Sequence, residues 1–432
     1  MNLTFQPAAR LAGTVTVPGD KSITHRALLL GSLGEGAARI EGFLDSGDCR
    51  ATIGCLQALG VEIERPQAET LVVHGQGLRG WREPEDVLDC IRSGTTMRLM
   101  AGLLAGQPFA SVLRAEPQLR RRPMDRIIAP LANMGAKIAG REGNRLPPLI
   151  ILGRPLHGAK HALPVASAQV KSCLLLAGLY AQGTTTVREP GPSRDHTERM
   201  LRGRGVAVQS AGLTHSLSGP VGRLDAVDVR VPGDFSSAAY LIVAALLVPG
   251  SEIVIRHVGV NPTRTGLLNA LWAMGADITL ENERDEGGEP VADLRVRSSE
   301  LHGTTVGGEL APRMIDEFPI LALAASQAQG ETRVRDAAEL RVKETDRVAT
   351  TVAALRALGA QIEPAPDGFD IWGGATLVGA PVDGQGDHRL AMTLAVAGLI
   401  AQGETAVLGA ECIQDSFPGF AETLGRVAGG AL

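Results

Sequence analysis

Aromatic side chains are scarce in this sequence, since Phe, Trp and Tyr together make up 3% of the residues. Proteins that bind single-stranded nucleic acid stack the bases on aromatic rings and carry an excess of positive charge. The formal net charge here is -5. We therefore expect no nucleic-acid partner, and any affinity for anions has to come from local clusters of cations.

Cysteine is also scarce, and the five residues Cys49, Cys55, Cys90, Cys173 and Cys412 are scattered without CxxC or Cys/His ligand spacing. This favours free thiols in a reducing cytosol over disulfides or a zinc site. Apolar runs such as AAYLIVAALLV are too short to span a bilayer, and the N-terminal stretch MNLTFQPAARLAG is not of the signal type. We expect a cytoplasmic protein with no metal and no membrane contact.

Glycine, in contrast, is abundant, with 53 residues. A pattern of Leu-x-x-x-Gly followed by an apolar residue recurs at spacings of 75, 70, 70 and 84 residues, and a degraded sixth copy, LGRVAGG, lies near the C-terminus. A glycine at this position ends a helix because it adopts the left-handed conformation readily. The pattern predicts six α/β units, with helices that stop at Gly60, Gly135, Gly205, Gly275 and Gly359.

The turn Val-Pro-Gly-Asp occurs twice, at 17–20 and 231–234, and each copy precedes an apolar helical run. Six units divided by this duplication give two similar lobes of three units each. We predict an α/β fold with a first lobe at 19–231, a second lobe at 1–18 and 232–432, and a two-stranded hinge at the two turns. Only the first copy is followed by Lys21 and Arg26, so we interpret the second as a structural turn.

Cationic and small polar residues recur where apolar helices begin. Asp20 or Ser22 can cap the helix that carries Lys21 and Arg26, and the free N–H groups of its first turn attract anions. The stretches SGTTMR, RRPM, SAQVKS, SRDHTER, RVKETDR and GDHRLAM resemble this construction. Neither a P-loop nor the dinucleotide fingerprint fits the chain.

Two of these stretches allow more specific predictions. RVKETDR places Lys343 and Arg347 four residues apart, and we expect them on one helical face with Glu344 beside them. Lys171, in SAQVKS, either contributes to an anion site or forms an ion pair. Carboxylates are few near these motifs, and many cations with two or three carboxylates suit a small polyanion and proton transfer.

The motifs GDKSITHR, SGTTMR, RRPM, SAQVKS, IDEFP, LRVKETDR and DHRLAM occur in this order along the chain. Together they resemble the enolpyruvyl transferase family, in particular its 5-enolpyruvylshikimate-3-phosphate synthase branch, over essentially the whole chain. The resemblance implies two lobes of three βαβαββ units, an inside-out α/β barrel. It also implies enolpyruvyl transfer from phosphoenolpyruvate to the 5-hydroxyl of shikimate 3-phosphate, with loss of phosphate, in chorismate biosynthesis. A monomer without cofactor is expected.

The resemblance assigns roles to individual residues. Shikimate 3-phosphate, mainly on the first lobe, would contact Lys21, Ser22, Arg26, Ser167, Ala168, Gln169, Arg194, Asp316 and Lys343. Phosphoenolpyruvate, with much of its site on the second lobe, would contact Lys21, Gly94, Arg122, Gln169, Arg347 and Arg389. Asp316 would accept the 5-hydroxyl proton, and Glu344, or alternatively Lys21, would protonate the methylene carbon. Shikimate 3-phosphate is expected to close the lobes.

The chain departs from the family pattern in two places. Ile91-Arg92 stands where many members carry Gly-Asn, and Asp415 stands near the C-terminus where some carry Lys. Gly94, in turn, leaves free the space that an alanine methyl would fill. We therefore expect inhibition by glyphosate, an anionic competitor of phosphoenolpyruvate in this family.

The sequence is also compatible with two alternative functions. The sister enzymes that transfer enolpyruvyl to UDP-N-acetylglucosamine typically carry Lys-Asn where this chain has Lys21-Ser22, and a Cys in a loop that has none here. A noncatalytic repeat scaffold that binds anions is the second alternative. The acceptor used in a phosphate-release assay distinguishes the three.

Overall fold

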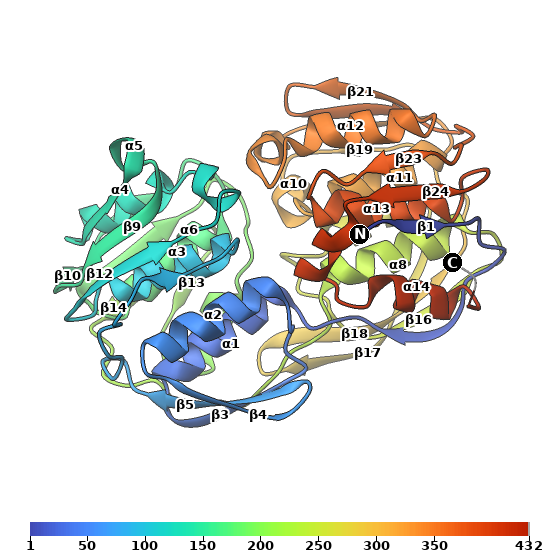
Figure 1. Ribbon diagram of the computed structural model, residues 1–432. Helices are drawn as coiled ribbons and strands as arrows, with labels where there is room; N and C mark the ends of the chain where they lie inside the picture. The colour runs from blue at the N-terminus through green and yellow to red at the C-terminus, as the bar shows by residue number, and fades with distance from the viewer. Residues whose placement is uncertain (431–432) are drawn as a thin grey trace. The chain divides into compact units, whose positions relative to one another are not determined.

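The computed structural model describes residues 1–430 (Figure 1). The chain folds as two compact units, each with its own buried apolar cluster. We call the unit formed by Gly19–Val231 and Glu286–Glu289 the first lobe. The unit formed by Met1–Pro18, Pro232–Asp285 and the chain from Pro290 onward is the second lobe.

Three sheets of one design form the first lobe. Their strands are β3 (Glu35–Glu41), β4 (Glu62–Gln67), β5 (Thr70–Gln76), β6 (Leu88–Asp89), β7 (Ala110–Arg114), β8 (Lys137–Gly140), β9 (Leu146–Leu152), β10 (Leu156–His157), β11 (Lys160–Ala162), β12 (Ala181–Arg188), β13 (Gln209–Ala211), β14 (Thr214–Gly219) and β15 (Val229–Arg230). The strand orders are β15-β3-β5-β4, β6-β7-β9-β8 and β10-β12-β14-β13, with β11 also paired to β12. In each sheet a short edge strand runs parallel to its neighbour, and the next two strands add antiparallel.

The second lobe repeats this design. Its strands are β1 (Leu3–Phe5), β2 (Ala12–Thr16), β16 (Glu252–Gly259), β17 (Asp277–Glu286), β18 (Glu289–Arg297), β19 (Thr305–Val306), β20 (Glu331–Val334), β21 (Gln361–Ala365), β22 (Gly368–Trp372), β23 (Pro381–Asp383) and β24 (Thr405–Leu408). The orders are β17-β18-β16-β2, β19-β20-β22-β21 and β1-β24-β23. In the last sheet β1, from the N-terminus, pairs antiparallel with β24 (Figure 1).

Each lobe encloses three helices that are buried almost all round. The first-lobe helices are α1 (Lys21–Leu33), α2 (Gly47–Ala58), α3 (Gly94–Leu104), α4 (Asp125–Asn133), α5 (Arg141–Asn144), α6 (Ala168–Gly178) and α7 (His196–Arg202), with the 3-10 turn η1 (Leu119–Arg121). The second-lobe helices are α8 (Phe235–Leu247), α9 (Gly266–Ala273), α10 (Leu310–Arg313), α11 (Phe318–Gln327), α12 (Arg347–Ala357), α13 (His388–Gly398) and α14 (Phe420–Val427), with η2 (Ala338–Val342) and η3 (Ala410–Asp415). The buried ones are α1, α3 and α6 in the first lobe and α8, α11 and α13 in the second. Helices that are apolar all round belong inside a core, and the sheets lie outside them.

At each of the two Val-Pro-Gly-Asp turns the chain passes from one lobe to the other. β2 belongs to a second-lobe sheet, yet the turn that follows it leads into α1 of the first lobe. β15 belongs to a first-lobe sheet, and its turn leads into α8 of the second. A Cβ on Gly19 would lie 2.0 Å from the Gly42 carbonyl oxygen, so this crossing requires glycine.

The helix-ending glycines are confirmed. Gly60, Gly135, Gly205, Gly275 and Gly359 have φ values of +85°, +90°, +83°, +91° and +99°. After each glycine, the next N–H bonds to the carbonyl of the pattern's leucine at 3.0 Å, as in Val61 to Leu56. The predicted fold of two lobes with three α/β units each is therefore confirmed.

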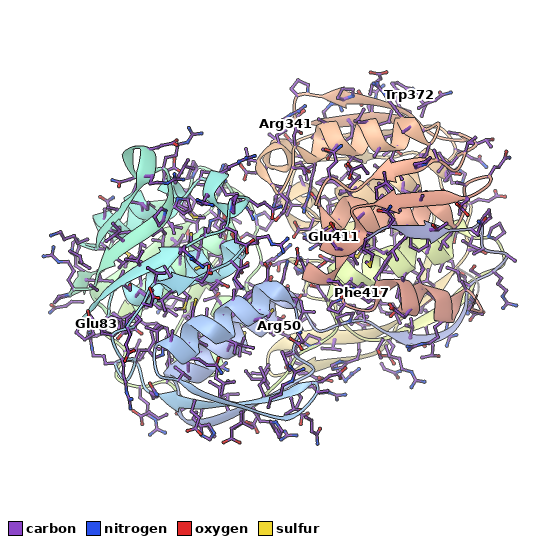
Figure 2. The ribbon with its side chains drawn as sticks, viewed as in Figure 1. Arg50, Glu83, Arg341, Trp372, Glu411 and Phe417 are labelled. Atoms are coloured by element: carbon purple, nitrogen blue, oxygen red, sulfur yellow. The ribbon has the colours of Figure 1, made fainter. Side chains whose placement is uncertain are left out.

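The outer side chains of the sheets are partly exposed, as Trp372 on β22 shows with 40% exposure (Figure 2). Across residues 1–430, none of the helices has the length and apolar character needed to cross a membrane. All five cysteines are buried free thiols.

Candidate active site

Short polar side chains cap the helices at which the sequence predicts anion-binding starts. In each case a side-chain oxygen accepts a hydrogen bond from a backbone N–H of the first turn, which leaves the neighbouring N–H groups available to a ligand. The pairs are Asp20 with Ile23 (2.8 Å) for α1, Ser93 with Thr96 (3.1 Å) for α3, Ser167 with Val170 (3.4 Å) for α6, and Asp387 with Arg389 (2.9 Å) for α13. These helices begin at the predicted motifs.

The start of α1 carries polar groups of the first lobe. Lys21 Nζ lies 3.1 Å from Asp48 Oδ2 on α2, and each of these side chains is 18% exposed. Ser22 Oγ lies 3.4 Å from an Arg194 guanidinium nitrogen that comes from the segment before α7. The fold thus brings Ser22 and Arg194 together, although 172 residues separate them in sequence.

Arg26 lies deeper than the sequence suggested. Its guanidinium is buried and donates hydrogen bonds to Thr197 Oγ1 at 2.7 Å, to Ser172 Oγ at 2.7 Å and to the Ser22 carbonyl at 2.9 Å. Burial lowers the pKa of Arg26 to about 10, with Glu198 opposing the shift. The group therefore stays charged at neutral pH, and it supports the backbone that presents Ser22.

Gly94 and Gln169 are brought together at the adjoining starts of α3 and α6. Gln169 accepts a hydrogen bond from Arg98 and donates one to Thr95 Oγ1 at 2.9 Å. A Cβ placed on Gly94 would lie 3.1 Å from an Arg98 terminal nitrogen and 3.3 Å from one of Arg122. Three predicted site residues, Gly94, Arg122 and Gln169, are therefore neighbours within the first lobe.

Lys171 forms buried ion pairs, which resolves the alternative left by the sequence. Its Nζ lies 2.6 Å from Glu189 Oε2 and 2.9 Å from Glu198 Oε1. His215 lies 3.6 Å and 3.4 Å from the same two carboxylates. Although burial raises the pKa of Glu189, hydrogen bonds from His215 and Lys171 hold it below its usual value. Lys171 is a structural cation next to the helix start.

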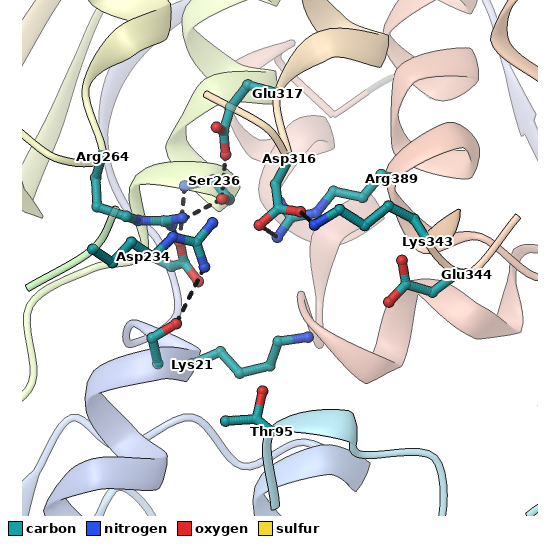
Figure 3. A network of polar contacts seen from close by, with 12 residues as sticks. Lys21, Thr95, Asp234, Ser236, Arg264, Asp316, Glu317, Lys343, Glu344 and Arg389 are labelled. Atoms are coloured by element: carbon teal, nitrogen blue, oxygen red, sulfur yellow. Dashed lines mark hydrogen bonds and ion pairs between the residues drawn. The ribbon is translucent and has the colours of Figure 1, made fainter. Parts of the chain in front are cut away.

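Asp316 lies among three cations in the second lobe, two of which, Lys343 and Arg389, are seen beside it in Figure 3. Its Oδ1 is 3.2 Å from Arg347 and 3.7 Å from Lys343 Nζ, and its Oδ2 is 3.8 Å from Arg389. The side chain is 14% exposed, so it remains accessible to a small molecule. Four residues that the sequence assigns to substrate contacts thus meet at one point.

Arg347 connects the two predicted catalytic carboxylates. It is 1% exposed and binds Asp387 through two nitrogens, at 2.8 and 3.2 Å, and Glu344 at 2.7 Å. Burial acts to lower the pKa of Arg347, but Asp387, Glu344 and Asp316 raise it well above its usual value. Burial also acts to lower the pKa of Arg389, but its neighbours, Asp316 foremost, raise that pKa above its usual value. Both guanidinium groups are permanent charges at the site.

The predicted helical pairing of Lys343 with Arg347 is wrong. Lys343 follows the 3-10 turn η2, and α12 begins only at Arg347. Asp346 determines this start, because its side chain accepts hydrogen bonds from the N–H groups of Val348 and Ala349 at 3.1 Å. Lys343 and Arg347 therefore approach Asp316 from a loop and a helix start.

Sequence reasoning missed Asp48 and Asp387. An Asp before an apolar helix predicts a cap, and Asp387 is one, in the quoted motif GDHRLAM. Its bidentate contact with Arg347, 40 residues earlier, depends on the tertiary fold and leaves no local signal. Asp48 is likewise an ordinary first-turn acid until the fold places it beside Lys21.

The two departures from the family pattern, at Ile91-Arg92 and at Asp415, lie in different kinds of structure. Arg92 is 46% exposed and lies 3.4 Å from Glu116, so it forms a surface ion pair. Asp415 ends η3. Ile91 has φ of +51°, a left-handed conformation that is unusual for a β-branched residue and natural for the glycine of many family members.

Fold and site together define a two-lobe α/β protein with helix starts and cations arranged for small anions. The model of the family described as EPSP synthase (3-phosphoshikimate 1-carboxyvinyltransferase) matches residues 5–424. The chain belongs to this family.

Individual relatives agree over the full length. A 3-phosphoshikimate 1-carboxyvinyltransferase from Geobacter sp. (strain M21) is 54% identical over 426 residues, covering 99% of both chains. One from Gloeobacter violaceus is 55% identical over 422 residues, or 98% of both chains. The structure of an EPSP synthase from Acinetobacter baumannii matches with a TM-score of 0.89 at 42% identity, covering 99% of this chain and 98% of that one.

Proposed function

We propose that this chain transfers the enolpyruvyl group of phosphoenolpyruvate to the 5-hydroxyl of shikimate 3-phosphate and releases inorganic phosphate, in aromatic amino-acid biosynthesis. The observation that carries the proposal is Asp316, a carboxylate with three cations at 3.2, 3.7 and 3.8 Å. A base beside several cations suits deprotonation of a hydroxyl on an anionic substrate. Family membership and the names of the relatives support the same reaction.

Shikimate 3-phosphate is assigned mainly to the first lobe, residues 19–231. The proposed contacts there are Lys21, Ser22, Arg26, Ser167, Ala168, Gln169 and Arg194, with Asp316 and Lys343 added by the second lobe. Hydroxyl, amide and cationic donors around the capped starts of α1 and α6 suit a phosphate, because each can donate to its oxygens.

Phosphoenolpyruvate is assigned to groups of both lobes, much of it to residues 232–432. Its proposed contacts are Lys21, Gly94, Arg122, Gln169, Arg347 and Arg389. Arg347 and Arg389 keep their charge through neighbouring carboxylates, and arginine binds carboxylate and phosphate oxygens in bidentate fashion.

The proposed chemistry is addition followed by elimination. Asp316 accepts the proton of the 5-hydroxyl as its oxygen bonds to the central carbon of phosphoenolpyruvate, while Glu344, or Lys21, delivers a proton to the methylene carbon. In the second step the bond from that carbon to the phosphate oxygen breaks, the new methyl group returns one proton to the group that donated it, and the proton held by Asp316 leaves with the phosphate. The double bond is thus restored and phosphate leaves, so acid and base groups of the chain balance the reaction.

Phosphate release provides the test. The protein is mixed with phosphoenolpyruvate and either shikimate 3-phosphate or UDP-N-acetylglucosamine, and phosphate is measured over time. Release with shikimate 3-phosphate alone is expected. Release with the nucleotide sugar alone would assign the sister activity, and release with neither would leave an anion-binding scaffold.

Glyphosate sensitivity is the first prediction about this site. Gly94 has no side chain beside Arg98 and Arg122, and an alanine methyl there would press on both guanidinium groups, at 3.1 and 3.3 Å. We expect glyphosate to compete with phosphoenolpyruvate with an inhibition constant no higher than the Michaelis constant, and Gly94→Ala to weaken glyphosate more than phosphoenolpyruvate. Competition kinetics on both proteins measure this. An unchanged ratio of the two constants in Gly94→Ala would contradict it.

A further inference from the structure

A buried polar chain lies directly behind Asp316. Glu317, the next residue, is buried at the start of α11 and accepts a hydrogen bond from the hydroxyl of Ser236 (Figure 3). Ser236 belongs to the first turn of α8, the helix that follows the second Val-Pro-Gly-Asp turn. The segment that carries Asp316 is therefore attached to this turn through a side chain.

Arg264 completes the chain. One terminal nitrogen of its buried guanidinium lies 2.8 Å from Asp234 Oδ1 and 2.9 Å from Ser236 Oγ. Arg264 is itself held in a tight turn, because its N–H bonds to the Asn261 carbonyl at 2.8 Å. Asp234, Ser236, Arg264 and Glu317 thus form one network within the second lobe.

The donors and acceptors give this network a direction. A serine hydroxyl has a single proton to donate. Because Ser236 Oγ accepts from Arg264, its own proton is directed to Glu317, whose carboxylate can only accept. The Glu317 N–H in turn bonds to the Met314 carbonyl at 2.9 Å, and its carbonyl accepts from Leu321 at 2.9 Å. Side chain and backbone of residue 317 are both fixed, and with them the backbone of Asp316.

We propose that Arg264 is a positioning residue for Asp316, acting through Ser236 and Glu317. The inference rests on the proposed role of Asp316 as the base. It gives the second Val-Pro-Gly-Asp turn a part in catalysis, since Asp234 of that turn anchors Arg264. Burying charged groups is costly unless they are paired, and here Arg264 pairs with Asp234 while the Ser236 hydroxyl links Arg264 to Glu317.

The physical reason is the precision that proton transfer demands. A base has to lie within hydrogen-bond reach of the proton it takes, and a displacement of about 1 Å costs on the order of 100-fold in rate. Arg264→Lys keeps a positive charge, but one terminal guanidinium nitrogen makes both contacts and the shorter lysine side chain does not reach its position, so the contacts to Asp234 and Ser236 are not maintained. We expect kcat to fall by about 10- to 100-fold, with both KM values changing less than about threefold.

A double-mutant cycle tests the route of the effect. If Arg264 acts by positioning Asp316, Arg264→Lys has no further effect on the residual kcat of Asp316→Ala. Ser236→Ala breaks the same chain while retaining the contact of Arg264 with Asp234. It should likewise have no further effect on the residual kcat of Asp316→Ala, and it serves as the test if Arg264→Lys folds poorly.

The matched control is Arg204→Lys, since Arg204 is a buried first-lobe arginine bound to the Met200 carbonyl at 3.1 Å. It should lose thermal stability and keep its kcat.

The outcomes separate the inference from the proposed function. The positioning role would be overturned if Arg264→Lys and Ser236→Ala each lowered kcat by the same factor in Asp316→Ala as in the parent protein. So would a rise in KM with kcat unchanged, which indicates lost binding. Parent-level kcat in Asp316→Ala alone would instead reject Asp316 as the base, and the proposed mechanism with it.

Discussion

The two helices that follow the Val-Pro-Gly-Asp turns begin alike and differ in what they carry. Asp20 and Asp234 both cap their helices through the side chain, Asp20 by accepting from the N–H of Ile23 and Asp234 by accepting from that of Ser236. The first residue of α1 is Lys21, partly exposed and paired with Asp48, whereas the first residue of α8 is the buried Phe235. One copy of the turn therefore presents a cation, and the other anchors an internal network.

The same difference recurs at the next helix starts. In the first lobe α3 and α6 are capped by Ser93 and Ser167, whereas in the second lobe α11 and α13 begin after the carboxylates Glu317 and Asp387. Hydroxyl and cationic donors suit binding of phosphates, and carboxylates clamped by arginine suit proton transfer. The equivalent helix starts thus carry hydroxyl caps in the first lobe and follow carboxylates in the second.

The largest effect is expected where the lobes differ most, at the caps of α6 and α13. Asp387→Ala removes a cap and leaves the buried Arg347 without its bidentate partner, so we expect a loss of about 3–5 kcal/mol in the free energy of unfolding. Ser167→Ala removes a cap alone and should cost about 1 kcal/mol. Urea unfolding of both variants measures the difference. Equal losses would show that Asp387 is no more than a cap.

Glu344 provides the second prediction, because it tests whether the second lobe supplies the acid. Glu344→Gln keeps the shape of the side chain beside Arg347 but has no proton to give, so both substrates should still bind while turnover falls by on the order of 100-fold or more. Single-turnover kinetics measure the step. Incorporation of deuterium from solvent into the methylene carbon of phosphoenolpyruvate shows separately whether that carbon is still protonated. Exchange at the parent rate in Glu344→Gln would transfer the donor role to Lys21 of the first lobe.

The sequence predicts those features that local backbone rules determine. Gly60 and its four equivalents end helices because of their own conformation, and the two turns show the duplication directly. The positions of the site motifs at helix starts follow from cap residues in the same way. Contacts such as Arg347 with Asp387, or Arg98 with Gln169 at a separation of 71 residues, depend on the packed lobe. The prediction that Lys343 and Arg347 share a helical face was wrong because spacing alone does not show that the helix cap, Asp346, lies between them.

His25 makes the third prediction, an acid sensitivity confined to the α1 copy of the repeat. Burial lowers the pKa of His25 to about 3, although Asp48 acts in the opposite direction. Ala239 occupies the corresponding position of α8. Between pH 6.5 and about 3 the unfolded chain binds a proton at this histidine and the folded chain does not. Stability is therefore lost as the pH falls below 6.5, by about 2 kcal/mol at about pH 5.

The measurement is the difference in urea midpoint between about pH 7.5 and about pH 5, for the parent and for His25→Ala. His25→Ala is expected to be less stable at the higher pH, because it leaves a cavity, and to lose less on acidification. A decline as steep as that of the parent would assign the acid sensitivity to other groups.

The smallest effect is expected at Ile91, which precedes the cap of α3 by two residues, as Ile315 precedes that of α11. Ile91 has φ of +51° and Ile315 is not left-handed, so the two positions share a place in the repeat and differ in strain. A β-branched side chain in this conformation costs about 1–2 kcal/mol, and glycine removes that cost at an entropic penalty of about 0.5–1 kcal/mol. Ile91→Gly should therefore raise the free energy of unfolding by up to about 1 kcal/mol.

Ile315→Gly is the control. It relieves no backbone strain and loses packing against the second-lobe core, so it should lower that free energy by about 2 kcal/mol or more. Thermal unfolding of both variants gives the two signs, and a loss at Ile91→Gly comparable to that at Ile315→Gly would mean that the packing of Ile91 outweighs its backbone strain.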